Sequence, residues 1–348
     1  MNRNKQVGWI GIIASVALLS GCTLSGSTGS SPIDPPPATS EGTDTQAVAA
    51  SAEAAANTFN ATLYVRDGDG YIVPVGVKLP YDTPDVAKRT LQYMVKGGPG
   101  ESLLPEGFGA VLPEGTEVVS LDIDATTRTA TVDFNESFLN YDPSEERDIL
   151  EAVTWAMTGY PSVEYVQLWV EGKALKEMPV AQTPLDDPLS RKFGINIERA
   201  SGVEFSRATP VTLYFLNQTA DNFTYYVPVT RLVEWTDDVA SATVAELVKG
   251  PLETSQLDAV FLPAEQAENK VALEGEHIQV DLDAALAASG QGVPSEGLQA
   301  VVLSLTEYMP GKNVQITVGG EAPVPASAGE SGGEAPVSRP KVVNPLEM

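Results

Sequence analysis

Two aspartates that recur 148 residues apart are the best candidates for acid–base chemistry. Asp133 and Asp281 each lie between two apolar residues near the end of an expected strand. A pair of carboxylates that flank a glycosidic bond can act as general acid and as base or nucleophile. The alternative is a structural role, in which each carboxylate caps the turn that follows it, helped by Asn135 or Asp283. We expect the capping role, so these residues predict no catalytic pair.

The other common sets of catalytic and metal-binding residues are incomplete in the sequence. His277 is the only histidine, and its alternation with Ile278 places it on the solvent face of a strand. A single histidine and a single cysteine disfavour zinc. The segment Asp67-Gly68-Asp69-Gly70 begins like a calcium loop but lacks the later ligands, so we expect a turn. Nucleophile-elbow, phosphate-loop and dinucleotide-binding glycine patterns are absent. The sequence therefore predicts no metal, no cofactor and no enzymatic activity.

Three tryptophans raise the question of a carbohydrate platform. They are Trp155, Trp169 and Trp235, which lie in or next to expected helices and strands. Large aromatic side chains more often fill the core of such elements, and we expect that role here.

Cys22 is the residue whose chemistry the sequence predicts most clearly. It is the only cysteine, so it has no disulfide partner within the chain. An apolar run from Val7 to Leu19 precedes it, which is too short for a permanent membrane span and is typical of an export signal. Leu19-Ser20-Gly21-Cys22 is similar to a bacterial lipobox, which implies diacylglycerol transfer to the Cys22 thiol and cleavage before it. The alternative is an ordinary signal peptide with an incidental cysteine. Acyl chains on Cys22 would hold the protein on the extracytoplasmic face of the membrane.

The charge of the chain limits its partners. Its formal net charge is −26, with 43% hydrophobic residues. The hydrophobic fraction is ordinary for a globular protein. An anionic surface repels phosphate backbones and anionic lipid headgroups, so we expect no nucleic-acid binding. Contact with the membrane should come from the lipid anchor alone.

Composition divides the chain into six segments. Residues 1–21 are the expected signal peptide, and 22–58, rich in Ser, Gly, Pro and Ala, are an expected disordered tether. Two ordered blocks, 59–179 and 207–319, are joined by a linker at 180–206 that we expect to pack locally. Residues 320–348, rich in Gly, Pro, Ala and Ser, are an expected disordered tail.

The two ordered blocks are copies of each other. Six motifs recur in the same order at offsets between 148 and 154 residues, and chance agreement of this kind is improbable. The clearest are Val95-Lys96-Gly97-Gly98-Pro99 with Val248-Lys249-Gly250-Pro251, Leu112-Pro113 with Leu262-Pro263, and Val132-Asp133 with Val280-Asp281. The sequence therefore contains a tandem duplication.

Each copy has the pattern of a small α+β domain. The strands expected at 61–66 and 71–79 flank a turn and form a hairpin. A helix should follow Pro84, capped by Asp82 or Thr83 and with an apolar face that includes Ala87 and Leu91. Two further strands, a second helix and a last strand complete each copy. We expect two helices on one face of a mostly antiparallel sheet.

With the lipobox, the tether and the two repeats, the chain resembles the GerM family of sporulation and spore-germination lipoproteins. Its repeats are similar to GerMN domains, over residues 19–22 and about 59–320. The resemblance implies a protein of endospore-forming bacteria that acts between the mother-cell and forespore membranes. It also implies a fold similar to the ring-building domains of secretion systems, and it transfers no catalytic residue.

These observations predict a non-enzymatic lipoprotein that helps to assemble an envelope complex during sporulation. Its expected partners are the membrane, through Cys22, and unidentified proteins of that complex, with a homo-oligomer or ring as an open possibility. The alternatives are a wall-acting enzyme of germination, which would need Asp133 or Asp281, and a lipoprotein that binds peptidoglycan.

Overall fold

The computed structural model describes residues 57–81, 85–262, 264, 267–287, 292–323 and 335–346, all within the compact unit Ser51–Met348. Cys22, residues 22–56 of the expected tether and the expected caps Asp82 and Thr83 lie outside the described residues, whereas Thr58 at the end of the expected tether already belongs to the first strand. Among those residues, no helix is both long enough and apolar enough to cross a membrane.

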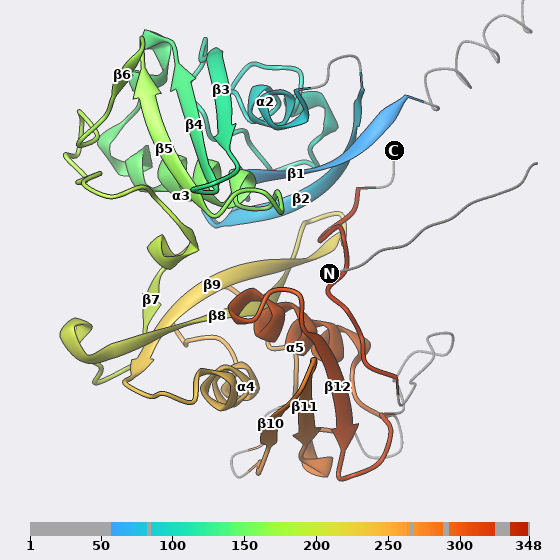
Figure 1. Cartoon of the computed structure of the whole chain (residues 1–348). Helices are drawn as coiled ribbons and strands as arrows, with labels where there is room; N and C mark the ends of the chain where they lie inside the picture. The colour runs from blue at the N-terminus through green and yellow to red at the C-terminus, as the bar shows by residue number, and fades with distance from the viewer. Residues whose placement is uncertain are drawn as a thin grey trace, which may run out of the picture. The chain divides into compact units, whose positions relative to one another are not determined.

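The first repeat is built from a hairpin, two helices and a four-stranded sheet (Figure 1). Its principal elements are β1 (Thr58–Arg66), β2 (Ile72–Pro80), α2 (Val86–Gln92), β3 (Val118–Asp124), β4 (Thr129–Phe134), α3 (Glu146–Met157), β5 (Tyr165–Val170) and β6 (Lys173–Ala174). The order in the sheet is β3-β4-β5-β6, while β1 and β2 form a separate antiparallel ribbon.

The second repeat follows the same order. Its elements are β7 (Glu198–Arg199), β8 (Ala208–Gln218), β9 (Thr224–Glu234), α4 (Val239–Lys249), β10 (Lys270–Glu274), β11 (His277–Leu282), α5 (Ser295–Tyr308) and β12 (Asn313–Val318). The sheet order is β10-β11-β12, and β7 adds a short parallel strand to the β8–β9 hairpin. The prediction of two tandem α+β repeats is confirmed.

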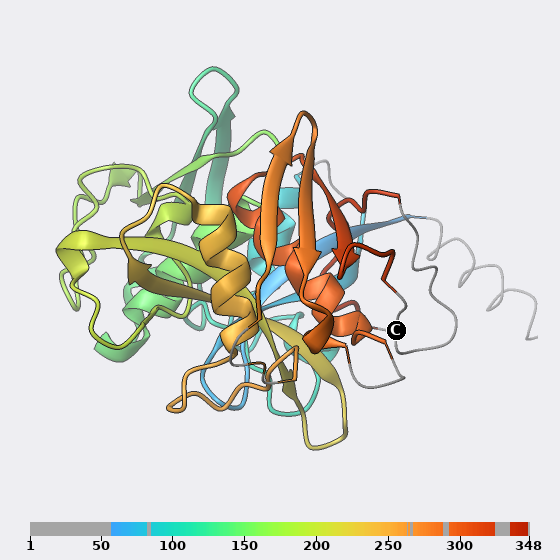
Figure 2. The same cartoon turned by 90° about the horizontal axis from the view of Figure 1, so that it is seen from below.

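The arrangement inside each repeat differs from the expected single sheet. Because β4 connects to β5 through α3, the two strands run parallel, and β11 and β12 do the same through α5. The helices lie between the two sheets: α3 packs against β1 and β2 on one side and β5 on the other, and α5 packs against β8 and β12 (Figures 1 and 2). Each repeat therefore has three layers.

The two helix ends that share a Lys-Gly sequence behave differently. In the second repeat α4 runs to Lys249, and Gly250 follows with a positive φ of 84°, as the sequence predicts. In the first repeat α2 ends at Gln92, so the positive φ of 70° at Gly97 belongs to the connection beyond the helix. Ala87 and Leu91 are buried, so α2 has the apolar face that the sequence predicts.

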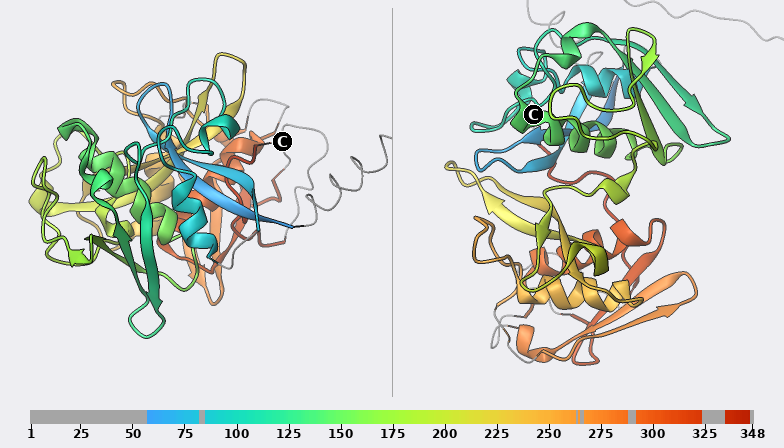
Figure 3. Two further views of the ribbon diagram at one scale, coloured as in Figure 1. Left: turned by 90° about the horizontal axis from the view of Figure 1, so that it is seen from above. Right: turned by 90° about the vertical axis from the view of Figure 1, so that its left-hand side faces the viewer.

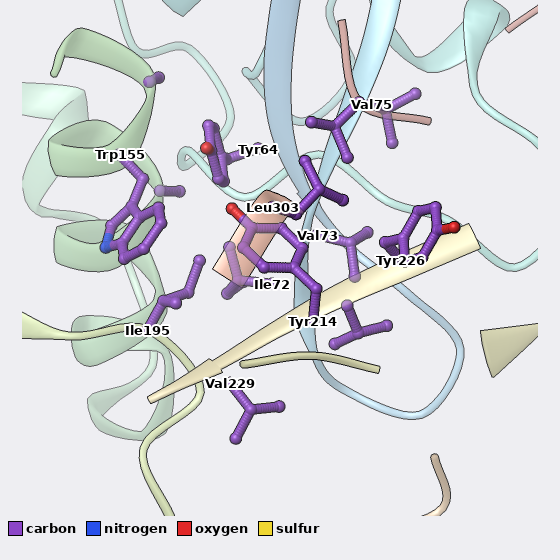
Figure 4. Close-up of a cluster of buried hydrophobic side chains, with 14 of the residues drawn as sticks. Tyr64, Ile72, Val73, Val75, Trp155, Ile195, Tyr214, Tyr226, Val229 and Leu303 are labelled. Carbon is purple, nitrogen blue, oxygen red and sulfur yellow. The ribbon is translucent and has the colours of Figure 1, made fainter. Parts of the chain in front are cut away.

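The buried side chains of both repeats form one continuous core. Where the hairpins meet, β2 lies beside β9 (Figures 1 and 3). The cluster there combines Tyr64, Ile72 and Trp155 of the first repeat with Tyr214, Tyr226 and Leu303 of the second (Figure 4). The repeats thus share a core.

Candidate functional site: the joint between the repeats

Asn196 connects the two hairpins. Its side-chain Oδ1 accepts a hydrogen bond from the Ile72 amide at 2.8 Å, and its Nδ2 donates to the Ile72 carbonyl at 2.8 Å. The same Nδ2 also donates to the Pro228 carbonyl at 2.7 Å. One amide side chain therefore satisfies backbone groups of β2 in the first repeat and β9 in the second.

Asn344 makes the same set of contacts with the repeats exchanged. Its Oδ1 accepts from the Tyr226 amide, and its Nδ2 donates to the carbonyls of Tyr226 and Pro74, each at 2.8 Å. Tyr226 and Pro74 are the duplicated equivalents of Ile72 and Pro228, so the two asparagines follow one rule. Each binds both backbone groups of one residue in its own repeat and one carbonyl of the other repeat. The joint is thus pseudo-symmetric and is fixed by directional bonds as well as by apolar contact.

Two arginines precede these asparagines and repeat the symmetry. Arg191 donates from Nε to Thr158 Oγ1 at 3.0 Å and from Nη2 to the Trp155 carbonyl at 3.4 Å. Arg339 donates to the corresponding groups at the end of α5, Thr306 Oγ1 at 3.1 Å and the Leu303 carbonyl at 2.7 Å. Each guanidinium therefore binds the C-terminal part of the second helix of its repeat, where the negative end of the helix dipole favours a cation.

Glu307 brings the two arginines together. It pairs with Arg191 through one oxygen and with Arg339 through the other, the latter at 2.8 Å. Burial alone would raise the pKa of Glu307, but the two guanidinium groups hold it below its usual value. Gly159 stands at the equivalent position of the first repeat, so this carboxylate is an asymmetric part of an otherwise duplicated joint.

The two segments that carry these residues, 189–196 and 337–344, are here called the closing arms. Leu189 bridges to Val166 on β5, and Val337 bridges to Val314 on β12, so each arm begins on the edge of its own sheet. Leu189-Ser190-Arg191 with Ile195-Asn196 recurs as Val337-Ser338-Arg339 with Val343-Asn344 at an offset of 148. This is an offset that the strand motifs also keep, and it was the signal that sequence reasoning missed.

The closing arms revise the expected boundaries. The tail predicted to be disordered from 320 to 348 is ordered over 335–346, where Val343 and Asn344 are buried. Residues 189–196 of the predicted linker at 180–206 are its counterpart. The prediction was wrong for the tail because composition averages over a Gly-rich stretch and a short packed segment that follows it.

The Asp67–Gly70 turn lies at the same joint. Asp67 Oδ1 accepts from the amides of Asp69 and Tyr71, at 3.0 and 2.8 Å. Its Oδ2 accepts from the Tyr225 hydroxyl at 2.9 Å and Asn217 Nδ2 at 3.3 Å. Burial raises the pKa of Asp67. The segment is therefore a turn, as expected, and its carboxylate binds the second repeat.

Asp133 and Asp281 have a structural role, although not the expected one. Asp133 accepts hydrogen bonds from the Gly172 amide at 3.0 and 3.1 Å, and Asp281 accepts from the Gly320 amide at 2.8 Å. Both therefore cap the turn after the neighbouring parallel strand, β5 or β12, and not the turn after their own strand. The two carboxylates lie in different sheets and form no catalytic pair.

The remaining sequence candidates do not converge. His277 lies half-buried at the start of β11, where Ile278 alternates with it and is buried. Trp155 is buried, and its Nε1 donates to the Gly194 carbonyl at 2.9 Å. Trp169 is half-buried on β5, whereas Trp235 is 69% exposed after β9, so the expectation of a core role fails for Trp235. Within the described ranges no cluster of three or more His, Cys, Asp or Glu residues could hold a metal ion.

A duplicated α+β unit closed by paired arms defines a tandem-repeat protein with one joint. The profile of the Germane family, described as sporulation and spore germination, matches residues 62–176 and 212–323. This chain belongs to that family.

Two comparisons extend this assignment. The chain is 38% identical over 300 residues to the spore germination protein GerM of Bacillus subtilis, covering 85% of this chain and 81% of that protein. The solved tandem GerMN domains of the B. subtilis sporulation protein GerM match with a TM-score of 0.74 and 38% identity, over 83% of this chain and 100% of that one. The matched family segments stop short of both closing arms.

Proposed function

We propose that this protein is a non-enzymatic scaffold of sporulation, anchored to the membrane through Cys22, that helps to assemble an envelope complex between the mother cell and the forespore. Family membership and the similarity to GerM support a role in sporulation. The scaffolding role and the anchor are our proposal, which rests on how the repeats use their polar residues.

The observation that carries the proposal is that the polar side chains shared by both repeats have internal partners. Asp133 and Asp281 cap turns, and the paired arginines and asparagines of the closing arms hold the joint. A duplication that retains a joint and supplies no repeated reactive group favours a rigid platform over a catalyst. The platform would present the outer surfaces of both repeats to other envelope proteins.

The test is the yield of heat-resistant spores from a strain that lacks the gene. Complementation with the wild-type chain should restore the yield, whereas a Cys22→Ala chain should be released from the membrane or accumulate as an uncleaved precursor. An Asp133→Asn/Asp281→Asn chain serves as the matched control, because it removes the carboxylates that a wall hydrolase would need. It should complement fully, since an asparagine Oδ1 can still accept from the Gly172 and Gly320 amides.

Three outcomes would contradict the proposal. Loss of complementation by the double asparagine chain, together with peptidoglycan cleavage by the wild-type protein, would favour the enzymatic alternative. Normal spore yield in the deletion strain would remove the sporulation role. Retention of mature Cys22→Ala protein in the detergent phase would remove the lipid anchor.

A further inference from the structure

A cavity in the first repeat has the size and charge of a small-ligand site. Its volume is about 350 Å³, and its lining includes Arg66, Asp67, Lys96, Glu145 and Phe108, with the backbone from Gly107 to Val111. Ligand pockets in proteins usually measure roughly 300–1,000 Å³, so this cavity is large enough for an amino acid or a short peptide. We call it the Arg66 cavity.

Charges of both signs surround the Arg66 cavity and come from separate parts of the chain. Arg66 ends β1, Lys96 follows α2, and Glu145 and Asp148 lie at the start of α3. The Lys96 ammonium lies 2.6 Å from Glu145 Oε1, Arg66 pairs with Asp148, and Arg66 Nη1 lies 4.0 Å from Glu145. These side chains are between 21% and 37% exposed, and three of them, Arg66, Lys96 and Glu145, line the cavity and are accessible to a ligand.

An aromatic residue forms an apolar part of the lining. Phe108 is half-buried and contacts Tyr225 edge to face, with ring centroids 5.0 Å apart. Tyr225 is in turn held by its hydrogen bond to Asp67. The orientation of Phe108 is therefore supported from the second repeat, which leaves the cavity preorganised.

The second repeat keeps two of these four charges, since Lys249 and Glu296 stand at the positions of Lys96 and Asp148, and it lacks the other two. Arg66 and Leu216 make the same antiparallel bridge, to Gly109 and to Asp258 respectively, so Leu216 occupies the position of Arg66. Val293 stands at the position of Glu145 in the offset that relates the second helices, and it is buried. Apolar residues commonly replace an ion pair without loss of stability. Arg66 and Glu145, which the second repeat lacks, therefore call for a role other than folding.

Gly109 also supports a role of this cavity other than folding. Its φ does not lie in the left-handed range, and a Cβ built on it would meet no atom within 4 Å. Neither backbone conformation nor packing requires glycine there, and the second repeat carries Asp258 at this position. Glycine leaves the lining of the Arg66 cavity open.

We propose that the Arg66 cavity binds a zwitterionic ligand, either a free amino acid or a short peptide with both termini uncapped. The ligand carboxylate would bind Arg66 and Lys96, and its ammonium group would bind Glu145. The ligand would enter between Lys96 and Glu145, so that each of them keeps a partner of opposite charge, while Arg66 keeps Asp148. An apolar side chain on the ligand would contact Phe108. This site goes beyond the scaffolding role and does not depend on it.

The experiment uses the purified chain and three forms of one dipeptide: glycyl-leucine, N-acetyl-glycyl-leucine and glycyl-leucine amide. Titration calorimetry and the amide NMR shifts of Gly107 and Gly109 report binding. We expect millimolar or tighter binding of the free dipeptide and at least about tenfold weaker binding of each capped form, because each cap removes one charge.

Variants locate the binding. Arg66→Leu and Lys96→Leu should weaken binding of glycyl-leucine at least about tenfold, and Gly109→Asp should do so by adding a side chain to the cavity lining. Lys88→Leu is the matched control, because Lys88 is a cation of the same repeat that bonds the Val119 carbonyl outside the cavity.

The absence of any shift at saturating dipeptide would overturn the proposal, and so would equal binding of the capped and free forms. These two results need no variant and remain decisive if a variant fails to fold. Equal effects of Lys96→Leu and Lys88→Leu would also overturn it. None of these results bears on spore yield, so the site and the scaffold can fail separately.

Discussion

The two repeats share their joint and differ in what surrounds it. Both carry a closing arm with an arginine and an asparagine that bind equivalent groups. The first carries the charged Arg66 cavity, and Leu216 and Val293 replace Arg66 and Glu145 in the second. The second repeat instead supplies Glu307, which pairs with the arginines of both arms. The comparison separates residues that both copies need for folding from residues that one copy has for another reason.

The largest effect should follow removal of the second closing arm, by a stop codon at position 335. The truncation deletes Arg339 and Asn344 and leaves backbone groups of Tyr226 and Pro74 without their partners. Leaving buried polar groups unsatisfied costs about 1–3 kcal/mol each, so the free energy of unfolding should fall by about 4 kcal/mol or more. Chemical denaturation measures the loss.

The control for this truncation is a chain that ends after Leu346. It should be as stable as the wild type, because it keeps every described residue of the arm. If the chain truncated at 335 were equally stable, the arm would be an accessory to the joint and the symmetry described above would have no energetic meaning.

A smaller and more informative effect is expected from single substitutions of the two asparagines. Asn196→Ala and Asn344→Ala each remove three hydrogen bonds to backbone groups, and each should cost about 2–3 kcal/mol in unfolding free energy. Because the bonds are equivalent, the two losses should agree within about 1 kcal/mol, the scatter usual for such measurements. A loss confined to one variant would show that one arm carries the joint alone.

Much of this architecture follows from local sequence patterns, and the joint does not. Hairpins, helices and the duplication leave periodic or repeated signals, such as Val132-Asp133 and Val280-Asp281. The contacts of Asn196 depend on two hairpins that meet only in the folded molecule, 32 and 124 residues away in the chain. The repeated motif of the closing arms can be found in the sequence. Its role cannot, because no local feature distinguishes a segment that binds both hairpins from a linker.

The Arg66 cavity was equally hidden from sequence reasoning. Its charges come from β1, the segment after α2 and the start of α3, which are separate in the sequence and come together only in the fold. A comparison of the two copies could have found the replacement of Arg66 by Leu216, since both follow matching Leu-Tyr motifs. Residues that recur in both copies reveal the duplication, whereas a position at which the copies differ leaves no repeated signal.

Glu151 offers a pH-dependent test of the difference between the arms. It is 2% exposed and pairs with Arg147. It also accepts a hydrogen bond from the backbone N–H of Asn196 at 2.8 Å. Gln299 stands at its position in the second repeat. Burial raises the pKa of Glu151 to about 7 from a usual value of 4.5. Between these two values the folded state binds more protons than the unfolded state, so stability should fall as the pH rises.

The expected loss from this group between pH 5 and pH 7.5 is on the order of 2–3 kcal/mol, at about 1.4 kcal/mol for each unit of pKa shift. Glu151→Gln, which installs the residue of the second repeat, should remove this part of the pH dependence. Urea denaturation at several pH values measures the difference between the two proteins. Parallel curves for the wild type and Glu151→Gln would contradict the assignment of the shift to Glu151.

The smallest effect on stability should come from the change that most alters the proposed ligand site. Arg66→Leu combined with Glu145→Val gives the first repeat the residues of the second and removes charges that are partly exposed. Exposed and half-exposed ion pairs contribute about 0–1 kcal/mol, so the free energy of unfolding should change by less than about 1 kcal/mol. The variant leaves Asp148 without Arg66, but the Asp148 side chain is 23% exposed and is still solvated by water.

If the double variant instead lost as much stability as Asn196→Ala, the charges would be part of the fold of the first repeat, and the difference between the copies would no longer argue for a ligand. If the double variant is stable but no longer binds glycyl-leucine, the charges of the Arg66 cavity serve ligand binding, whereas the residues of the joint serve folding.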